Sequence, residues 1–116
     1  MLSNKQTDID AAVDAAGRES LIENGCVRTT VAGVARAATV SRPTFYARYS
    51  TIEDMTSNLL TRELLPLGAR LNPLPTTVEG LVDALISGAN DLRKNELIVA
   101  VVAHDAELLL RWERAS

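Results

Sequence analysis

The chain has 116 residues, a length that allows one domain, or a small domain with part of a second, and excludes a large multi-domain enzyme. Twelve Lys and Arg residues against fifteen Asp and Glu residues give a net charge of -3, so total charge supports neither nucleic-acid nor membrane binding. Hydrophobic residues make up 47% and aromatic residues only 3%, and this Ala-, Leu- and Val-rich composition predicts an all-α fold.

The single cysteine, Cys26, cannot form a disulfide within the chain, and the residues before Ile9 show neither a basic leader nor an apolar run. The longest apolar run, Leu97–Ala103, is far shorter than the roughly 20 residues of a membrane span. We therefore expect a soluble, cytoplasmic protein.

The first helix is expected to begin near Thr7 and to end at Asn24-Gly25, which is a typical C-cap sequence. Thr29 or Thr30 can cap a short second helix. Ser41 can cap a third helix, in which a proline falls in the first turn, where its missing N–H does no harm.

A fourth helix is expected to begin at Ser50 or Thr51, with Ser50 and Glu53 forming a capping box, and to end or kink at Pro66. The sequence Asn-Pro-Leu-Pro at 72–75 is the strongest helix breaker in the chain. It predicts a tight boundary between two structural units.

Beyond this break, Thr76 and Glu79 form a second capping box. The helix that follows is predicted to be buried along one side by Val78, Leu81, Val82, Leu85, Ile86, Ala89 and Leu92. The run Leu97–Ala103 is apolar all round, as in a helix surrounded by protein, and Asp105 caps a last segment. Seven helices are expected in all.

Charge is distributed unevenly along the chain. No acidic residue lies between Glu23 and Glu53, a segment that carries +4 from Arg28, Arg36, Arg42 and Arg48. The remainder then carries -7, because -3 minus +4 is -7. An acid-free basic segment in an acidic chain is typical of a surface that meets phosphates, but on charge alone a solvated face that lacks Asp and Glu is the better explanation.

The residues V-A-G-V-A-R-A-A-T-V-S-R-P-T-F-Y-A-R-Y, at 31–49, predict two short helices joined by a tight turn. Small Ala35 lets the helices cross closely, and Val34, Ala38, Val40 and Phe45 fill the angle between them. The polar edge of the second helix is left free for a DNA groove, which is the arrangement of a helix-turn-helix.

This first half of the chain resembles the DNA-binding domain of the tetracycline-repressor (TetR) family of transcriptional regulators, through T-x-x-x-V-A, V-S-x-P-T-F-Y and the later E-D-M. The resemblance implies a DNA-binding domain over residues 1–50, a connecting helix over 51–71 and part of a regulatory domain over 72–116. It further implies repression, a small apolar effector and a homodimer of the full-length protein.

The resemblance also implies which residues meet double-stranded operator DNA. Thr30 and Tyr46 would contact phosphate, while Arg48 would follow on the same exposed side. The start of the recognition helix would meet base edges and backbone through Ser41, Arg42, Pro43 and Thr44. An Arg42 fork can bind guanine O6 and N7, and Thr44 can touch a thymine methyl or a phosphate.

Two positions depart from the family pattern. Thr39 stands where the turn usually has Gly, so the turn must adopt another geometry or carry strain. Ile52 stands where a phosphate-binding Lys is frequent. These departures are the support for an alternative function, a helical interaction module or degenerate regulator that no longer binds DNA.

An enzyme ranks third among the functions considered, because these residues do not provide a nucleophile, a base and an orienting group that could act together. His104, the only histidine, has no Cys or His companion at ligand spacing, so neither a metal nor another cofactor is expected. Phe45 and Tyr49 are interpreted as core residues, whereas Tyr46 fits core and contact equally well.

The C-terminal residues raise a separate expectation. Leu108, Leu109, Leu110 and Trp112 form an apolar face with only four residues after them. We therefore expect the chain to be a piece of a longer regulator, to be monomeric or ill-defined in assembly, and to bind a palindromic operator little better than a half-site.

Overall fold

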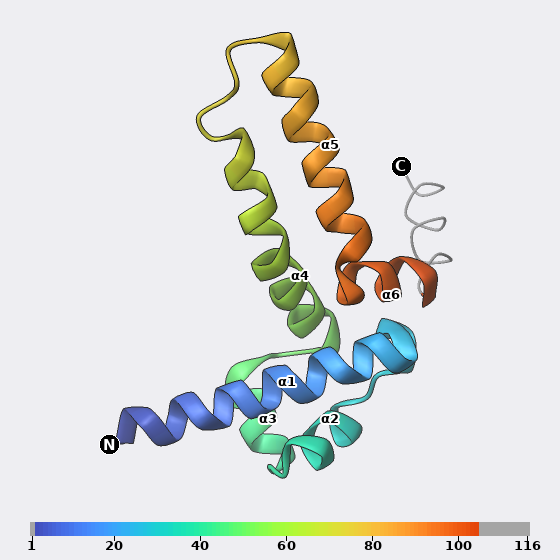
Figure 1. Ribbon diagram of the computed structural model, residues 1–116. Coiled ribbons are helices and arrows are strands. Elements are labelled where there is room, and N and C mark those ends of the chain that lie inside the picture. Colours follow the sequence, from blue (N-terminus) through green and yellow to red (C-terminus); the bar gives the residue numbers. More distant parts are fainter. Residues whose placement is uncertain (1, 105–116) are drawn as a thin grey trace.

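The computed structural model describes residues 2–104 (Figure 1). This part of the chain is helical without strands, which confirms the predicted all-α fold. The helices are α1 (Leu2–Arg28), α2 (Val31–Ala38), α3 (Arg42–Arg48), α4 (Ile52–Gly68), the 3-10 turn η1 (Ala69–Leu71), α5 (Val78–Lys94) and α6 (Glu96–His104). The seventh expected segment, with Leu108, Leu109, Leu110 and Trp112, lies outside the described residues, as does its cap Asp105.

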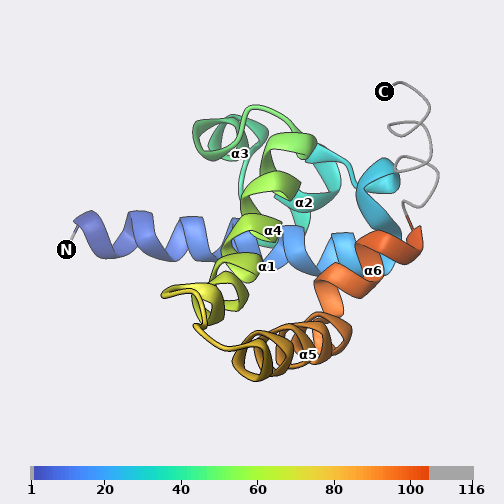
Figure 2. The same ribbon diagram turned by 90° about the horizontal axis from the view of Figure 1, so that it is seen from above.

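Helix α1 runs across the molecule and divides it into two layers. The short helices α2 and α3 lie on one side of it, whereas α4 and α5 rise from the other side as an antiparallel pair (Figure 1). The view from above shows α6 lying along the C-terminal half of α1, on which it packs (Figure 2). Helices α5 and α6, which follow the break at 72–75, therefore pack against the N-terminal helices α4 and α1.

The core forms where α1, α2, α3, α4 and α6 meet. Its buried members are Val13, Ala16, Leu21, Val34, Phe45, Tyr49, Ile52, Met55, Leu59 and Leu97. Gly17 allows α1 and α4 to approach closely, because a Cβ at this position would lie 2.5 Å from Met55 Sδ. The inward positions of Phe45 and Tyr49 confirm their interpretation as core residues.

The helix starts agree with the sequence in type and differ in register at two places. Thr30 Oγ1 accepts from the Gly33 N–H at 3.0 Å, and Ser41 Oγ accepts from the Thr44 N–H at 3.2 Å, as predicted. The two predicted capping boxes are wrong by one residue. The caps are Thr51, which accepts from the Asp54 N–H, and Thr77, which accepts from the Gly80 N–H.

Other boundaries shift for local reasons. Helix α1 starts before Thr7. At the predicted end, Asn24-Gly25, the helix is broken, since Gly25 has a φ of 79°, and the span of α1 continues beyond this kink to Arg28. Pro66 lies inside α4, which ends two residues later at Gly68. The helix tolerates this proline because the hydrogen bond that it lacks belongs to the last turn.

The predicted burial of the later helices is wrong within the described residues. No residue of α5 is buried, and its apolar stripe includes Val78 at 79% exposure. In α6, Leu97 is buried, while Val99 and Val102 are about half exposed. Helix α5 packs on α4, η1 and α6, and its apolar residues extend around a wider arc than these neighbours cover.

The turn between α2 and α3 is strained at Thr39, which is one of the two alternatives that the sequence left open. Thr39 adopts φ 59° and ψ 44°, the left-handed region that β-branched residues avoid. The turn is held by the Thr39 N–H to Arg36 O (3.1 Å) and the Val40 N–H to Ala35 O (2.9 Å), the two bonds of a Schellman motif.

We therefore expect Thr39→Gly to raise the free energy of unfolding by about 1 kcal/mol, because glycine adopts this conformation without steric cost. Denaturant titration of both proteins measures the difference. Ala37→Gly is the control, since it places glycine in the last turn of α2 and should lower stability. A loss of stability in Thr39→Gly as well would contradict the assignment of strain.

Candidate nucleic-acid interface

The helix-turn-helix unit exposes the start of its second helix. Phe45 is fully buried between the helices and anchors α3 to α2 and α1. Ser41, Arg42 and Pro43 are exposed, and Thr44 is half-buried. The Ser41 and Thr44 hydroxyls lie 2.8 Å apart, and Ser41 caps the helix, so its first turn is held rigid. This arrangement presents a fixed polar edge to solvent.

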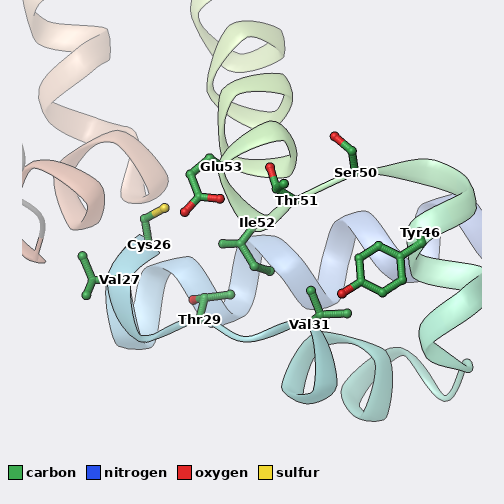
Figure 3. A pocket seen from close by; sticks show the side chains of 9 residues that line it. All are labelled: Cys26, Val27, Thr29, Val31, Tyr46, Ser50, Thr51, Ile52 and Glu53. Carbon is green, nitrogen blue, oxygen red and sulfur yellow. The ribbon is translucent and has the colours of Figure 1, made fainter.

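Tyr46 points to the same side of the molecule as the start of α2. Tyr46 is 54% exposed, and its ring packs edge-on against Phe45, with centroids 5.7 Å apart. It also lines a hollow of about 510 Å³ between the starts of α2 and α4, shown in Figure 3. Of the two interpretations of Tyr46, exposure favours contact over core.

The same hollow explains the departure at Ile52. Ile52 is 9% exposed and belongs to the core, so this position contributes packing. The residues that line the hollow include Glu53 but no basic residue (Figure 3). A phosphate in this hollow could accept hydrogen bonds from hydroxyl groups and from the N-terminus of α4, but no cationic side chain lines the hollow.

Arg48 does not lie on the exposed side of α3 where it was expected. Its side chain is only 27% exposed and turns back to α1, where it forms two hydrogen bonds with Asp14 at 2.8 and 2.7 Å. A third contact joins Nη1 to Asp10 Oδ2 at 3.2 Å. The guanidinium also lies over the Tyr49 ring. The expectation that Arg48 shares the exposed side is therefore wrong, because two carboxylates of α1 hold it.

The charge on the exposed face is correspondingly smaller than the sequence suggested. Arg28, Arg36 and Arg42 are exposed, whereas the charge of Arg48 is compensated by α1. The acid-free segment thus presents three cations rather than four.

Asp14 is the residue that sequence reasoning missed. It accepts hydrogen bonds from Arg48, from the Tyr49 hydroxyl at 2.7 Å and from Arg62 Nη2 at 2.7 Å. Arg62 Nη2 also donates to the Tyr49 hydroxyl at 2.9 Å. We call these four residues, Asp14, Arg48, Tyr49 and Arg62, the anchor cluster. The acidic pair Asp10 and Asp14, four residues apart on one helix face, was the available signal.

The anchor cluster shifts the pKa values of its members. Burial alone would raise the pKa of Asp14, but hydrogen bonds from Arg48, Tyr49 and Arg62 outweigh it and lower the pKa to about 2. Burial and the neighbouring Asp14 carboxylate raise the pKa of the Tyr49 phenol. Hydrogen bonding to Asp14 raises the pKa of Arg48 and of Arg62. At neutral pH Asp14, Arg48 and Arg62 are therefore charged, whereas the Tyr49 phenol is neutral and keeps its proton.

The lowered pKa of Asp14 predicts a loss of stability in acid. The unfolded state, with a pKa of 3.8, binds the proton before the folded state at about 2. Asp14 therefore contributes about 2 kcal/mol above pH 5, and this contribution is lost progressively as the pH falls below 5 and through the folded-state pKa. The difference in unfolding free energy between wild type and Asp14→Asn should shrink over this range. A constant difference would contradict the ionic role. Asp8→Asn, at an exposed position of the same helix, is the matched control for the substitution itself.

The described residues hold no group of three or more metal-ligating side chains. His104 lies with Nε2 3.1 Å from the Ile22 carbonyl oxygen, a contact of α6 with α1. None of the helices in residues 2–104 has the length and apolar character required to cross a membrane.

Comparison with known proteins points to one family. Residues 15–58 match the family model for bacterial regulatory proteins of the tetR family. An HTH-type transcriptional regulator of Mycobacterium tuberculosis (strain CDC 1551 / Oshkosh) is 29% identical over 113 residues, and one of Mycobacterium bovis (strain ATCC BAA-935 / AF2122/97) is 31% identical over 116 residues. Each match covers 97% of this chain and 60% of the relative. No solved structure matches the chain significantly.

Proposed function

We propose that the chain is a regulator of the TetR family, with which residues 15–58 match, and that it binds operator DNA sequence-specifically and regulates transcription. The observation that supports this most strongly is the capped, exposed start of α3 beside the buried Phe45. A recognition helix of this kind enters the major groove with its N-terminal residues toward the base edges.

The exposed residues divide into two groups by chemistry. Arg42 reads sequence, because its planar fork matches O6 and N7 of guanine, and Thr44 contacts a thymine methyl or a phosphate. Thr30, Ser41, Pro43 and Tyr46 position the helix on the backbone. Arg48 supports α3 from the α1 side.

The remaining properties concern a whole regulator. The chain spans 60% of the length of the relatives that it matches. We propose that it represses transcription in the cytoplasm as a homodimer and responds to a small apolar effector. The exposed apolar side chains of α5 support a regulatory unit that packs against further protein or ligand. We further propose a DNA-binding unit over 1–50, the connecting helix over 51–71 and a regulatory unit from 72 onward.

Selection of DNA from a random pool at two salt concentrations tests the proposal. We expect a recurring motif containing guanine, and affinity that falls with salt according to the number of phosphates contacted. Retention of random sequences without any motif would contradict specific recognition. It would favour the degenerate regulator that the buried Ile52 and neighbouring Glu53 suggest.

A further inference from the structure

The anchor cluster joins the recognition helix α3 to its neighbours α1 and α4. Asp14 comes from α1, Arg48 is the last residue of α3, Tyr49 is its C-cap, and Arg62 lies on α4. Both Asp14 oxygens are used. Oδ1 accepts from Arg48 Nε and the Tyr49 hydroxyl, and Oδ2 accepts from Arg48 Nη2 and Arg62 Nη2.

Helix α3 needs such a support because it is short. It has seven residues, of which Phe45 is the buried one. Beyond Phe45, the attachment of α3 depends on the residues at its C-terminal end, where Tyr49 is also buried. The anchor cluster fixes the C-terminal end through a two-pronged Arg48–Asp14 pair and the Tyr49 hydroxyl, groups whose geometry is directional.

The fixed end controls the DNA-facing end. Arg42 and Arg48 are six residues apart, which is about 9 Å along a helix axis. A rotation that released Arg48 would therefore displace Arg42 relative to a base edge. Base recognition depends on this position, whereas attraction to phosphates depends much less on it.

We propose that Asp14 is a positioning residue for sequence recognition, acting through Arg48 and Tyr49 without itself contacting DNA. The proposal rests on the proposed function and adds the residue that orients the reading helix. It also assigns the Tyr49 hydroxyl, which receives a hydrogen bond from Arg62 and donates one to Asp14, as the second element of this support.

Charge and position predict opposite results for Asp14→Asn. Removal of a negative charge alone would strengthen binding to all DNA. Loss of positioning weakens binding to the selected site, by about tenfold, while binding to random DNA stays equal or increases. Tyr49→Phe should produce the same selective loss with no change in charge.

The test measures affinities of the full chain for the DNA site selected by wild type and for random duplex. Asp8→Asn is the matched control, since Asp8 is exposed on the same helix and the charge change is identical. Circular dichroism and thermal unfolding of each variant establish that it is folded at the assay temperature. Tyr49→Phe, which keeps the ring in the core, provides the answer if Asp14→Asn does not fold.

A lower ratio of selected-site to random affinity in Asp14→Asn and Tyr49→Phe, and not in Asp8→Asn, is the expected result. Folded variants whose ratio equals that of Asp8→Asn would overturn the positioning role while leaving DNA recognition intact. A wild-type protein that selects no motif would instead remove the proposed function itself, so the two failures are distinguishable.

Discussion

Phe45→Ala is expected to lower the free energy of unfolding by about 3–5 kcal/mol, the largest effect of any substitution considered for this chain. Phe45 is fully buried and connects α3 with the core formed by α1, α2 and α4. Its removal leaves a cavity at the only fully buried position of a seven-residue helix. Denaturant unfolding followed by helical circular dichroism measures the loss.

Tyr46→Ala is the matched control for this prediction. It removes the neighbouring aromatic ring of the same helix, which is 54% exposed. The expected cost is about 0.5–1.5 kcal/mol, the contribution of its edge-on contact with Phe45. Equal losses for the two variants would show that α3 does not depend on Phe45 for its attachment.

Arg42→Ala is expected to reduce affinity for the selected DNA site by about 1–3 kcal/mol and to relax base preference at one position. Arg42 is exposed in the first turn of α3, and the Ser41 cap holds this turn in place. Binding to random DNA should fall much less. Competition titration with selected and random duplexes gives both affinities.

Arg36→Ala controls for the loss of a positive charge. Arg36 is exposed on α2 within the same acid-free segment, outside the start of the reading helix. It should weaken selected and random DNA alike. If Arg42→Ala does the same, Arg42 contacts phosphate and another residue reads the sequence.

Tyr46→Phe is expected to weaken binding to all sequences alike.

The local pattern of the sequence was sufficient to predict that the first four helices exist, but it did not fix the start of α1 or the capping of α4. Hydroxyl residues before apolar periodicity located the cap Ser41 and narrowed the cap of α2 to Thr29 or Thr30, of which Thr30 is the cap, since these bonds join residues three apart. Register was harder to predict where two candidate hydroxyls stood together, as at Ser50 and Thr51. Backbone geometry then decides which hydroxyl faces the free N–H groups, and that choice is not local to the sequence pattern.

Contacts between distant residues could not be predicted in the same way. The arginine at position 48 appeared available for DNA because its own segment has no acidic residue. Its partners lie on α1, 34 residues earlier in the case of Asp14, and meet it only after α3 packs across α1. Burial of α5 was overestimated for the same reason, because periodicity identifies an apolar face without identifying what covers it.

We propose that the start of α3 lies in the major groove of operator DNA, with Arg42 on a guanine. Methylation protection of guanine N7 in the selected site measures this directly, because N7 is exposed only in the major groove. We predict that saturating wild-type protein protects a guanine of the motif, and that Arg42→Ala at saturation leaves the same guanine reactive. Full reactivity of every guanine N7 in the wild-type complex would contradict the account.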